Sequence, residues 1–402
     1  MRRPKVRTAT LMLMLPILLS APRSRAENLK LGILTDLSSI YADVSGKGSI
    51  EAAEIAVTDM AAQPGPWTVE IVSAAHLGKA DVGGAIARQW LDEGGVDVIA
   101  GVPNSSVALA VQDLARQRQK IVLITGAATV DLTGKSCSPF TAHWTDDTFS
   151  LSSGAVRAAG GGERTFFFIA ADYAYGTSIQ AEASRVILAE HGQVVGSVRH
   201  PIGTPDFSSC LRQAQASRAG VTVLANGGAD TTNAVKQAHE FGLARSGQAL
   251  VVTGMFITDV NSIGLDTARG LFLATGFYWD RTDATRAWSH RFFQIIGRMP
   301  TREQAETYSA VTHYLRAIVA THTKDAAIVM RWMKEHQVED FYASGARLRA
   351  DGRLLHPIYL AQVKSPAQSH HPWDYYALTG TLKPDEAFRP LAEGGCSLVQ
   401  TR

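Results

Sequence analysis

From Leu29 onwards, short runs rich in Val, Ile and Leu alternate with stretches in which apolar residues recur every three or four positions. The short runs have the composition of parallel strands covered on both faces, and the longer stretches have the period of amphipathic helices. This alternation predicts a parallel sheet with right-handed crossovers. The first predicted unit has strands at 29–35, 68–75, 96–101 and 120–126 and helices at 48–62, 79–94 and 105–117.

The pattern then repeats, which predicts two α/β units of similar size. Segments 140–148 and 277–280 lack a clear period and are candidate connections between the units. The chain from Ser365 is rich in Pro, His and Trp and is predicted to be an irregular tail. The second unit has predicted strands at 165–171, 193–198, 221–227, 249–255 and 270–276 and helices at 175–191, 207–218 and 229–242; helices at 282–296, 301–322 and 325–336 and a strand at 358–363 follow.

The first 26 residues have the layout of a secretory signal peptide. A basic head precedes the apolar run 9–21, and Ser24 and Ala26 place small residues at the −3 and −1 positions of a cleavage site. The run is shorter than the roughly 20 residues that a membrane span needs. We therefore predict cleavage after Ala26 and a periplasmic protein, with an uncleaved membrane anchor as the alternative.

Charge and motifs exclude several classes of protein. Six of the 39 basic residues lie in the leader, which has no acid, so the net charge changes from +2 to about −4 once it is removed. A mildly acidic body argues against nucleic acid as a partner. No GxGxxG, GxxxxGK[ST], GxSxG or HExxH motif occurs. We therefore expect no cofactor, no metal and no catalytic site; a secreted enzyme is the alternative class.

The three cysteines are too widely spaced for a zinc site, but an exported protein can form a disulfide. Cys137 lies in a predicted loop and Cys396 in the Gly-rich tail, whereas Cys210 lies in a predicted helix, where a buried free thiol is usual. We predict a Cys137–Cys396 bond. A Cys137–Cys210 bond and three free thiols are the alternatives.

Hydroxyl-rich turns follow several predicted strands, and ligands of open α/β sheets bind beyond the carboxyl ends of strands. Ser105 and Ser106 follow the third strand and Thr129 follows the fourth. Hydroxyls and free N–H groups at a helix start can hold a carboxylate, although these residues are also ordinary helix caps. Because similar turns occur at 171–176 and 225–231 in the second unit, we favour a binding cleft between the units.

These turns, in their order and spacing, resemble periplasmic substrate-binding proteins of the branched-chain amino acid (Leu/Ile/Val-binding) type, which serve ABC importers. The resemblance covers essentially the whole chain after the leader. It implies an α/β fold of two Rossmann-like lobes with parallel sheets, joined by three crossovers, as in type I periplasmic binding proteins. The segments that carry it are 30–36, 101–106, 127–129 with 132–133, 172–176, 207–209, 238–243, 310–315 and 351–352.

The resemblance also implies domain boundaries and partners. Lobe one is expected at 27–141 plus 280–324 and lobe two at 142–279 plus 325–364, with the tail at 365–402. The protein is expected to be a monomer that closes on a small molecule and then docks on a membrane permease. A ligand sensor for a signalling receptor is an alternative partner arrangement.

By resemblance, Ser105, Ala127 and Thr129 would hold the ligand's carboxylate and Tyr175 would line the opposite wall. The family's ammonium-binding Glu has no counterpart, because Met255 and Phe256 stand in that region. A desolvated ammonium needs an acid or several carbonyls, so an apolar or aromatic ligand body is favoured.

The chain is most similar to a branch of the family associated with aromatic carboxylic acids. We predict an aromatic or related organic acid as the ligand, with Tyr41 and Phe256 as further walls of the cleft. Binding of a branched-chain or other aliphatic amino acid, with Asp230 or Asp259 for the ammonium, is the alternative. The marks of the branch are Trp144–Asp147, Phe277–Asp280, Val363–Pro366, Trp373–Tyr376 and Cys396.

Overall fold

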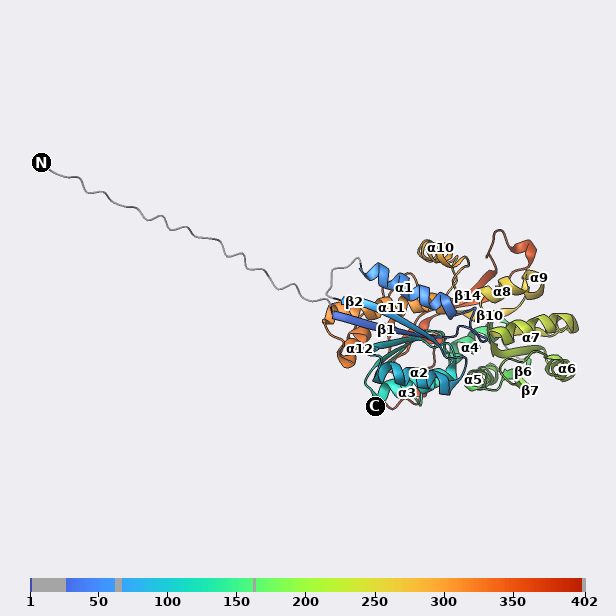
Figure 1. The fold of residues 1–402 in the computed structure, drawn as a ribbon. Coiled ribbons are helices and arrows are strands. Elements are labelled where there is room, and N and C mark those ends of the chain that lie inside the picture. Colours follow the sequence, from blue (N-terminus) through green and yellow to red (C-terminus); the bar gives the residue numbers. More distant parts are fainter. Residues whose placement is uncertain (2–26, 62–66, 162–163, 400–402) are drawn as a thin grey trace.

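The computed structural model describes Met1 and residues 27–61, 67–161 and 164–399, so the predicted leader and its cleavage site at Ala26 lie outside the described residues. Two lobes lie side by side, each built on its own sheet, and helices cover the sheets (Figure 1). The two α/β units predicted from the alternation of apolar and amphipathic stretches are therefore confirmed.

The sheet of the first lobe has the order β2-β1-β3-β4-β5, and every pairing is parallel. Its central strands β3 and β4 are buried over their whole length, as their continuous apolar runs predict. Alternate residues of β1 enter different cores, since Leu31 and Ile33 pack with one cluster and Leu34 with another. The elements are β1 (Glu27–Thr35), α1 (Gly46–Ala61), β2 (Trp67–Ala75), α2 (Ala80–Asp92), β3 (Val98–Gly101), α3 (Ser105–Gln117), β4 (Ile121–Ile124), β5 (Thr141–His143), α10 (Asp283–Ile296), α11 (Arg302–Thr321), α12 (Ala326–Glu335) and the hairpin β11 (Arg347–Leu348) and β12 (Leu354–Leu355).

The sheet of the second lobe has the order β14-β13-β10-β9-β8-β6-β7. Strands β6 to β10 pair in parallel, and β13 runs antiparallel to both of its neighbours. The elements are α4 (Thr148–Ala158), β6 (Thr165–Ala171), α5 (Ala174–Ala189), β7 (Gln193–His200), α6 (Ser208–Ser217), β8 (Val221–Gly227), α7 (Ala229–Glu240), β9 (Ala249–Gly254), α8 (Ile257–Ile263), α9 (Leu265–Ala268), β10 (Phe272–Thr275), β13 (Ile358–Val363), β14 (Tyr376–Leu382) and α13 (Pro384–Ala387).

Two of the predicted boundaries need correction. Helix α12 packs on α11 of the first lobe, where the His313 ring nitrogen Nε2 lies 3.0 Å from the Met333 carbonyl, so segment 325–364 does not belong to the second lobe as a whole. The tail is also not wholly irregular, because β14 forms the edge of the second sheet. Both ends of this strand are buried but its middle is partly exposed, so it lacks the continuous apolar run that marks the inner strands.

Within the described residues the chain passes between the two lobes at 143–148, 275–283 and 355–358, which agrees with the three crossovers expected. Asp146 lies where these connections meet. Its Oδ2 accepts a hydrogen bond from the Gly276 N–H at 2.8 Å, and its Oδ1 lies 3.7 Å from His356 Nε2. Because burial lowers the pKa of His356 to about 4, that imidazole is neutral at pH 7.

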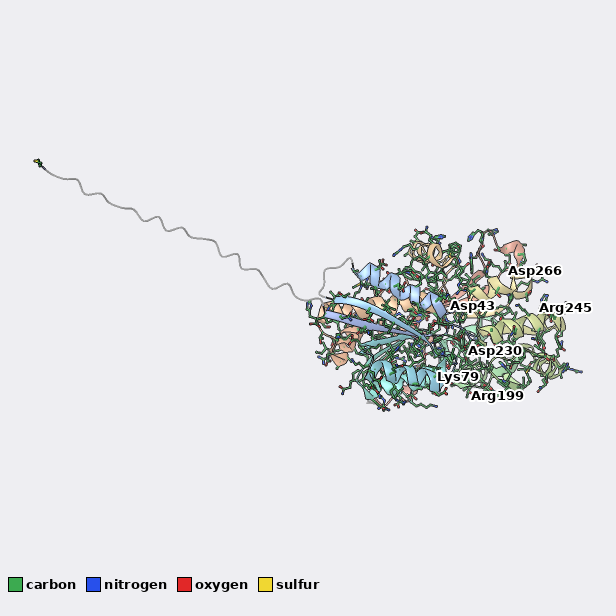
Figure 2. All side chains as sticks on the ribbon, in the orientation of Figure 1. Asp43, Lys79, Arg199, Asp230, Arg245 and Asp266 are labelled. Atoms are coloured by element: carbon green, nitrogen blue, oxygen red, sulfur yellow. A yellow bond between two sulfur atoms is a disulfide. The ribbon has the colours of Figure 1, made fainter. Side chains whose placement is uncertain are left out.

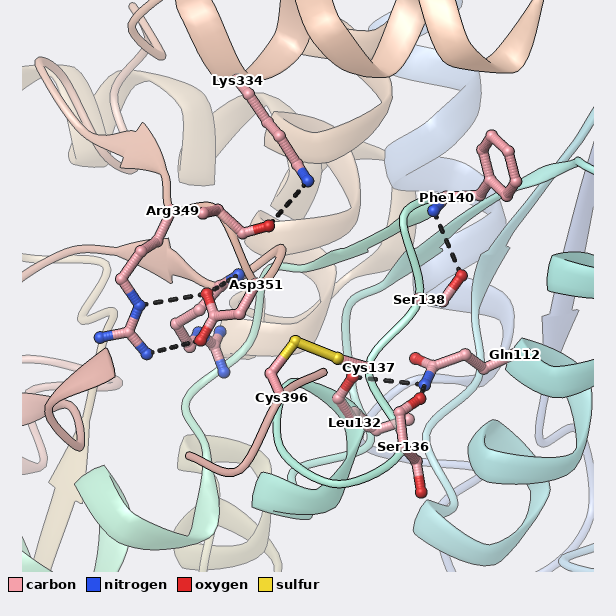
Figure 3. Close-up of a disulfide and its surroundings, with 12 residues drawn as sticks. Gln112, Leu132, Ser136, Cys137, Ser138, Phe140, Lys334, Arg349, Asp351 and Cys396 are labelled. Atoms are coloured by element: carbon pink, nitrogen blue, oxygen red, sulfur yellow. Dashed lines mark hydrogen bonds and ion pairs between the residues drawn. A yellow bond between two sulfur atoms is a disulfide. The ribbon is translucent and has the colours of Figure 1, made fainter. Parts of the chain in front are cut away.

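A disulfide joins Cys137 to Cys396, as predicted (Figure 3). Cys210 is a buried free thiol. Cys137 belongs to the first lobe, whereas the tail that carries Cys396 comes from β14 of the second lobe. On the way, Phe388 packs edge-on against the His356 ring, with 5.1 Å between ring centroids. The tail therefore passes beside the crossovers and forms a further, covalent link between the lobes.

Candidate functional site between the lobes

A small cavity lies between the carboxyl ends of the two sheets. The first lobe contributes the turns that follow β3 and β4, and the second lobe contributes the last residues of β8 and β9. The cavity volume is about 10 Å³, which is room for about one water molecule. Its lining residues are Tyr41, Pro103, Gly126, Ala128, Tyr175, Gly227, Gly254, Phe256, Arg302 and Glu303.

The lobes touch directly around this cavity. The hydroxyls of Tyr41 and Tyr173 are hydrogen-bonded across the cleft, and the Ala229 N–H donates to the Ile40 carbonyl at 3.0 Å. Gly228 has φ +60°, and a Cβ there would lie 2.1 Å from the Ile40 carbonyl oxygen. Only glycine permits this approach of the two backbones, so the structure is a closed form and a larger occupant requires the lobes to separate.

Three aromatic side chains form the walls, and all are buried. The Tyr41 N–H donates to Asp36 Oδ2 at 3.0 Å, which fixes the turn after β1. The Tyr175 hydroxyl donates to Thr253 Oγ1 at 3.2 Å, and burial raises the pKa of this phenol to about 12, so it is a neutral donor. Phe256 separates the cavity from a second one, also about 10 Å³, which is lined by further aromatic residues of the second lobe.

Two charged residues, Arg302 and Glu303, begin α11 and line the same cavity. Only 5% of Arg302 and 2% of Glu303 is exposed. The guanidinium carbon of Arg302 lies 4.4 Å from the Phe256 ring centroid, and its Nε lies 3.5 Å from Asp146 Oδ2. Burial raises the pKa of Glu303 to about 8, although Arg302 acts in the opposite direction, so this carboxyl is largely protonated at pH 7.

The sequence patterns did not identify these two residues. The sequence does contain one local indication of Arg302, which is its position in the first turn of a helix. A cation there is unfavourable because it opposes the helix dipole. Arg302 directly follows the N-cap Thr301, whose Oγ1 donates to the Val44 carbonyl at 2.6 Å. An arginine held in such an unfavourable position indicates a role that helix stability does not explain.

The predicted carboxylate-binding residues Ser105, Ala127 and Thr129 lie together in the first lobe, but they are absent from the cavity lining. The Thr129 N–H donates to Ser105 Oγ at 3.3 Å, and the Ala127 N–H donates to the Val102 carbonyl at 3.0 Å. In the closed form these N–H groups are therefore already used within the lobe. The neighbouring Ala128 lines the cavity instead.

Two other predicted residues also hold local structure. The Ser106 N–H donates to the Asn104 side chain at 3.0 Å as part of the α3 cap. Asp230 lies at the start of α7, in the middle of the molecule (Figure 2), and its Oδ2 accepts the Gly203 N–H at 3.1 Å. Tyr41, Tyr175 and Phe256, by contrast, all line the cavity as the predictions require.

Other hollows and clusters lie outside this cavity. A groove of about 290 Å³ between the same two lobes is lined by residues such as Ile40, Val44 and Asp259, and a cavity of about 450 Å³ lies within the second lobe beside α7 and α9. Asp280, His371 and Asp374 have potential metal-ligand atoms within 4.8 Å of one another. Asp374 is already engaged by the Lys364 ammonium, so ion pairing accounts for this group.

Comparison with known proteins agrees with this two-lobed arrangement. The model of the family described as "Periplasmic binding protein" matches residues 28–369. The chain belongs to this periplasmic binding protein family. It is 26% identical over 240 residues to the Leu/Ile/Val-binding protein homolog 6 of Brucella melitensis, a match that covers 59% of this chain and only 60% of that relative's length.

Several solved structures superpose over nearly the whole chain. A periplasmic binding protein from Burkholderia mallei is 41% identical, with a TM-score of 0.90 over 93% of this chain and 100% of that one. A branched chain amino acid ABC transporter periplasmic ligand-binding protein from Burkholderia xenovorans is 40% identical, with a TM-score of 0.82 over 92% and 99%. An R. palustris solute binding protein in complex with 4-hydroxybenzoate shares the fold at 20% identity, with a TM-score of 0.80 over 89% and 98%.

In the part of the chain that the structure describes, none of the helices has both the length and the apolar character needed to cross a bilayer.

Proposed function

We propose that this family member is the periplasmic solute-binding component of an ABC importer and that it captures a small carboxylate, aromatic or a related organic acid, between its lobes. The ligand binds while the lobes are apart, shifts the population toward the closed form and leaves the protein unaltered. The closed form is the one that a membrane permease recognises. We propose no catalytic step.

The observation that carries this proposal is the cavity itself. Tyr41, Tyr175 and Phe256 converge on it from both lobes, and a buried guanidinium accompanies them. Apolar walls with a few convergent polar groups are typical of sites for small molecules. The ligand of the R. palustris neighbour, 4-hydroxybenzoate, is an acid of the proposed class.

A second candidate, an amino acid ligand, is favoured by Glu303. The predicted ammonium partners Asp230 and Asp259 are held elsewhere, since Asp259 Oδ2 accepts the Phe256 N–H at 2.8 Å. Glu303 is the one carboxyl among the residues that line the cavity, and it could accept an ammonium if it were ionised. Its raised pKa, about 8, favours the proposal of an acid without an amino group.

A thermal-shift panel separates the two candidates. Each acid is paired with its amino counterpart: 3-phenylpropanoate with phenylalanine, and 4-methylpentanoate with leucine. 4-Hydroxybenzoate is added alone. A ligand at 100 times its Kd adds about 2.7 kcal/mol of stability. We expect the acids to raise the melting temperature and their amino counterparts to be weaker. A stronger response to leucine or phenylalanine would support the second candidate, and no response to any acid would refute the first.

A further inference from the structure

The first turn of α11 is held rigidly against the first lobe. Thr301 Oγ1 donates to the Val44 carbonyl at 2.6 Å, and Gln304 Nε2 donates to the Ser45 carbonyl at 3.3 Å. The Thr301 N–H also donates to Gln304 Oε1 at 3.0 Å, which completes a capping box. Arg302, between these anchors, therefore extends from a fixed backbone into the cleft.

Arg302 has donors that nothing in the described part of the chain uses. Its Nε and Nη1 atoms are buried and have no hydrogen-bond partner there. The contact with Asp146 Oδ2, 3.5 Å from Nε, is an ion pair that is too long for a good hydrogen bond. A buried guanidinium with unpaired N–H groups is costly, so its retention requires a compensating contact.

The surroundings of Arg302 favour an anion as that contact. Burial alone would lower the pKa of the guanidinium, but the neighbouring acidic groups, of which Asp146 has the largest effect, together hold this pKa above its ordinary value, so the group stays charged. Asp146 is itself fixed by the Gly276 N–H and lies on the Nε side. The terminal nitrogens of the guanidinium remain for a second partner, and their fork matches the two oxygens of a carboxylate.

We propose that Arg302 binds the carboxylate of the ligand and that Asp146 is the residue that positions its guanidinium. This inference rests on the proposed function, because it requires an acid in the cleft. The sequence predicted that uncharged groups at Ser105 and Thr129 hold the carboxylate. The inference instead assigns the carboxylate to a positively charged side chain at the start of α11. The ligand body then lies against the Phe256 ring, over which the guanidinium already stacks.

The test compares 4-hydroxybenzoate with 4-hydroxybenzamide, which lacks the charge, by isothermal titration calorimetry. We expect the unchanged protein to prefer the acid. Arg302→Gln should lose about 10- to 100-fold in affinity for the acid and should no longer prefer it to the amide, because hydrogen bonds to charged groups contribute that much. Arg298→Gln is the matched control. Arg298 pairs with Asp43 at 3.3 Å and does not line the cavity, so this variant should bind as the unchanged protein does.

Two further variants keep the inference falsifiable. Arg302→Lys retains the positive charge but lacks the forked pair of N–H donors, so it should bind the acid with an affinity between those of the unchanged protein and Arg302→Gln. If circular dichroism shows that Arg302→Gln does not fold, Arg302→Lys takes its place in the test. Thr129→Val should leave the affinity unchanged. If Thr129→Val loses affinity and the Arg302 variants do not, the inference is overturned while the proposed function stands. If the unchanged protein binds no acid, both are refuted.

Discussion

The disulfide between Cys137 and Cys396 links the lobes through the tail, and we expect its removal to destabilise the whole chain. Glu393 pairs with Arg185 on α5 of the second lobe at 2.7 Å, only three residues before Cys396. Three residues extend about 10 Å at most. While the disulfide and this ion pair both hold, the loop around Cys137 and helix α5 therefore cannot move far apart.

The size of the effect follows from the loop that the bond closes. Its ends are 259 residues apart, for which the chain-entropy relation gives about 5–6 kcal/mol at 25 °C. Loss of native disulfides typically costs about 2–5 kcal/mol, so we expect a loss of about 4 kcal/mol. With an unfolding entropy of about 2.1 cal/mol/K per residue, this lowers the melting temperature of a chain of this length by about 5 °C.

The assay is thermal unfolding of the unchanged protein and of Cys137→Ser/Cys396→Ser, each with and without dithiothreitol. Reductant should lower the melting temperature of the unchanged protein to that of the double variant. It should leave the melting temperature of the double variant unchanged. Cys210→Ser is the control, because Cys210 is a free thiol and this variant should keep the response to reductant. A double variant that melts within 1 °C of the unchanged protein would refute the reasoning.

Other predictions concern the cleft. Gly227→Ala should weaken acid binding about tenfold or more in calorimetry, since its Cβ would lie 2.9 Å from the Tyr41 hydroxyl across the lobes; equal affinity would mean that closure does not bring these groups together. The Glu303 carboxyl loses its proton near pH 4.5 in the unfolded chain but near pH 8 in the folded chain, so the unchanged protein loses stability as the pH rises between these values. Glu303→Gln does not titrate, so its stability relative to the unchanged protein should increase from pH 5 to pH 8, by up to roughly 4 kcal/mol. Urea unfolding at pH 5, 7 and 9 measures this, and a pH-independent difference would contradict it. Tyr173→Phe should remove the hydrogen bond to Tyr41 and shift the ligand-free protein toward open forms, seen as a larger radius of gyration in X-ray scattering; an unchanged radius would count against a closing role for this contact.

The fold was predictable because its strands are marked by composition. β4 is a short run of Ile, Val and Leu, β3 consists of Val, Ile, Ala and Gly, and both faces of each strand are buried. β14 was missed because it is an edge strand whose exposed residues include Thr379 and Thr381, so that no apolar run identifies it. Helix α12 was recognised, but its assignment to a lobe depends on tertiary contacts with α11 that no local pattern encodes.

The candidate site was predictable in part, for a similar reason. Aromatic residues beside strand ends indicated the walls Tyr41, Tyr175 and Phe256, which do line the cavity. Arg302 and Glu303 were missed because α11 lies about 200 residues after β3 in the chain, and only the folded structure brings its first turn beside Pro103 and Gly126. A search confined to strand ends cannot find such a contribution.

The most direct test of the central claim is a crystal structure of the protein with the acid that gives the largest thermal shift. We predict one acid molecule, chemically unchanged, between the rings of Tyr41 and Phe256, with its carboxylate within hydrogen-bond distance of the Arg302 guanidinium. Density for the acid only outside the cleft, for example beside α7 and α9 in the second lobe, would contradict the account.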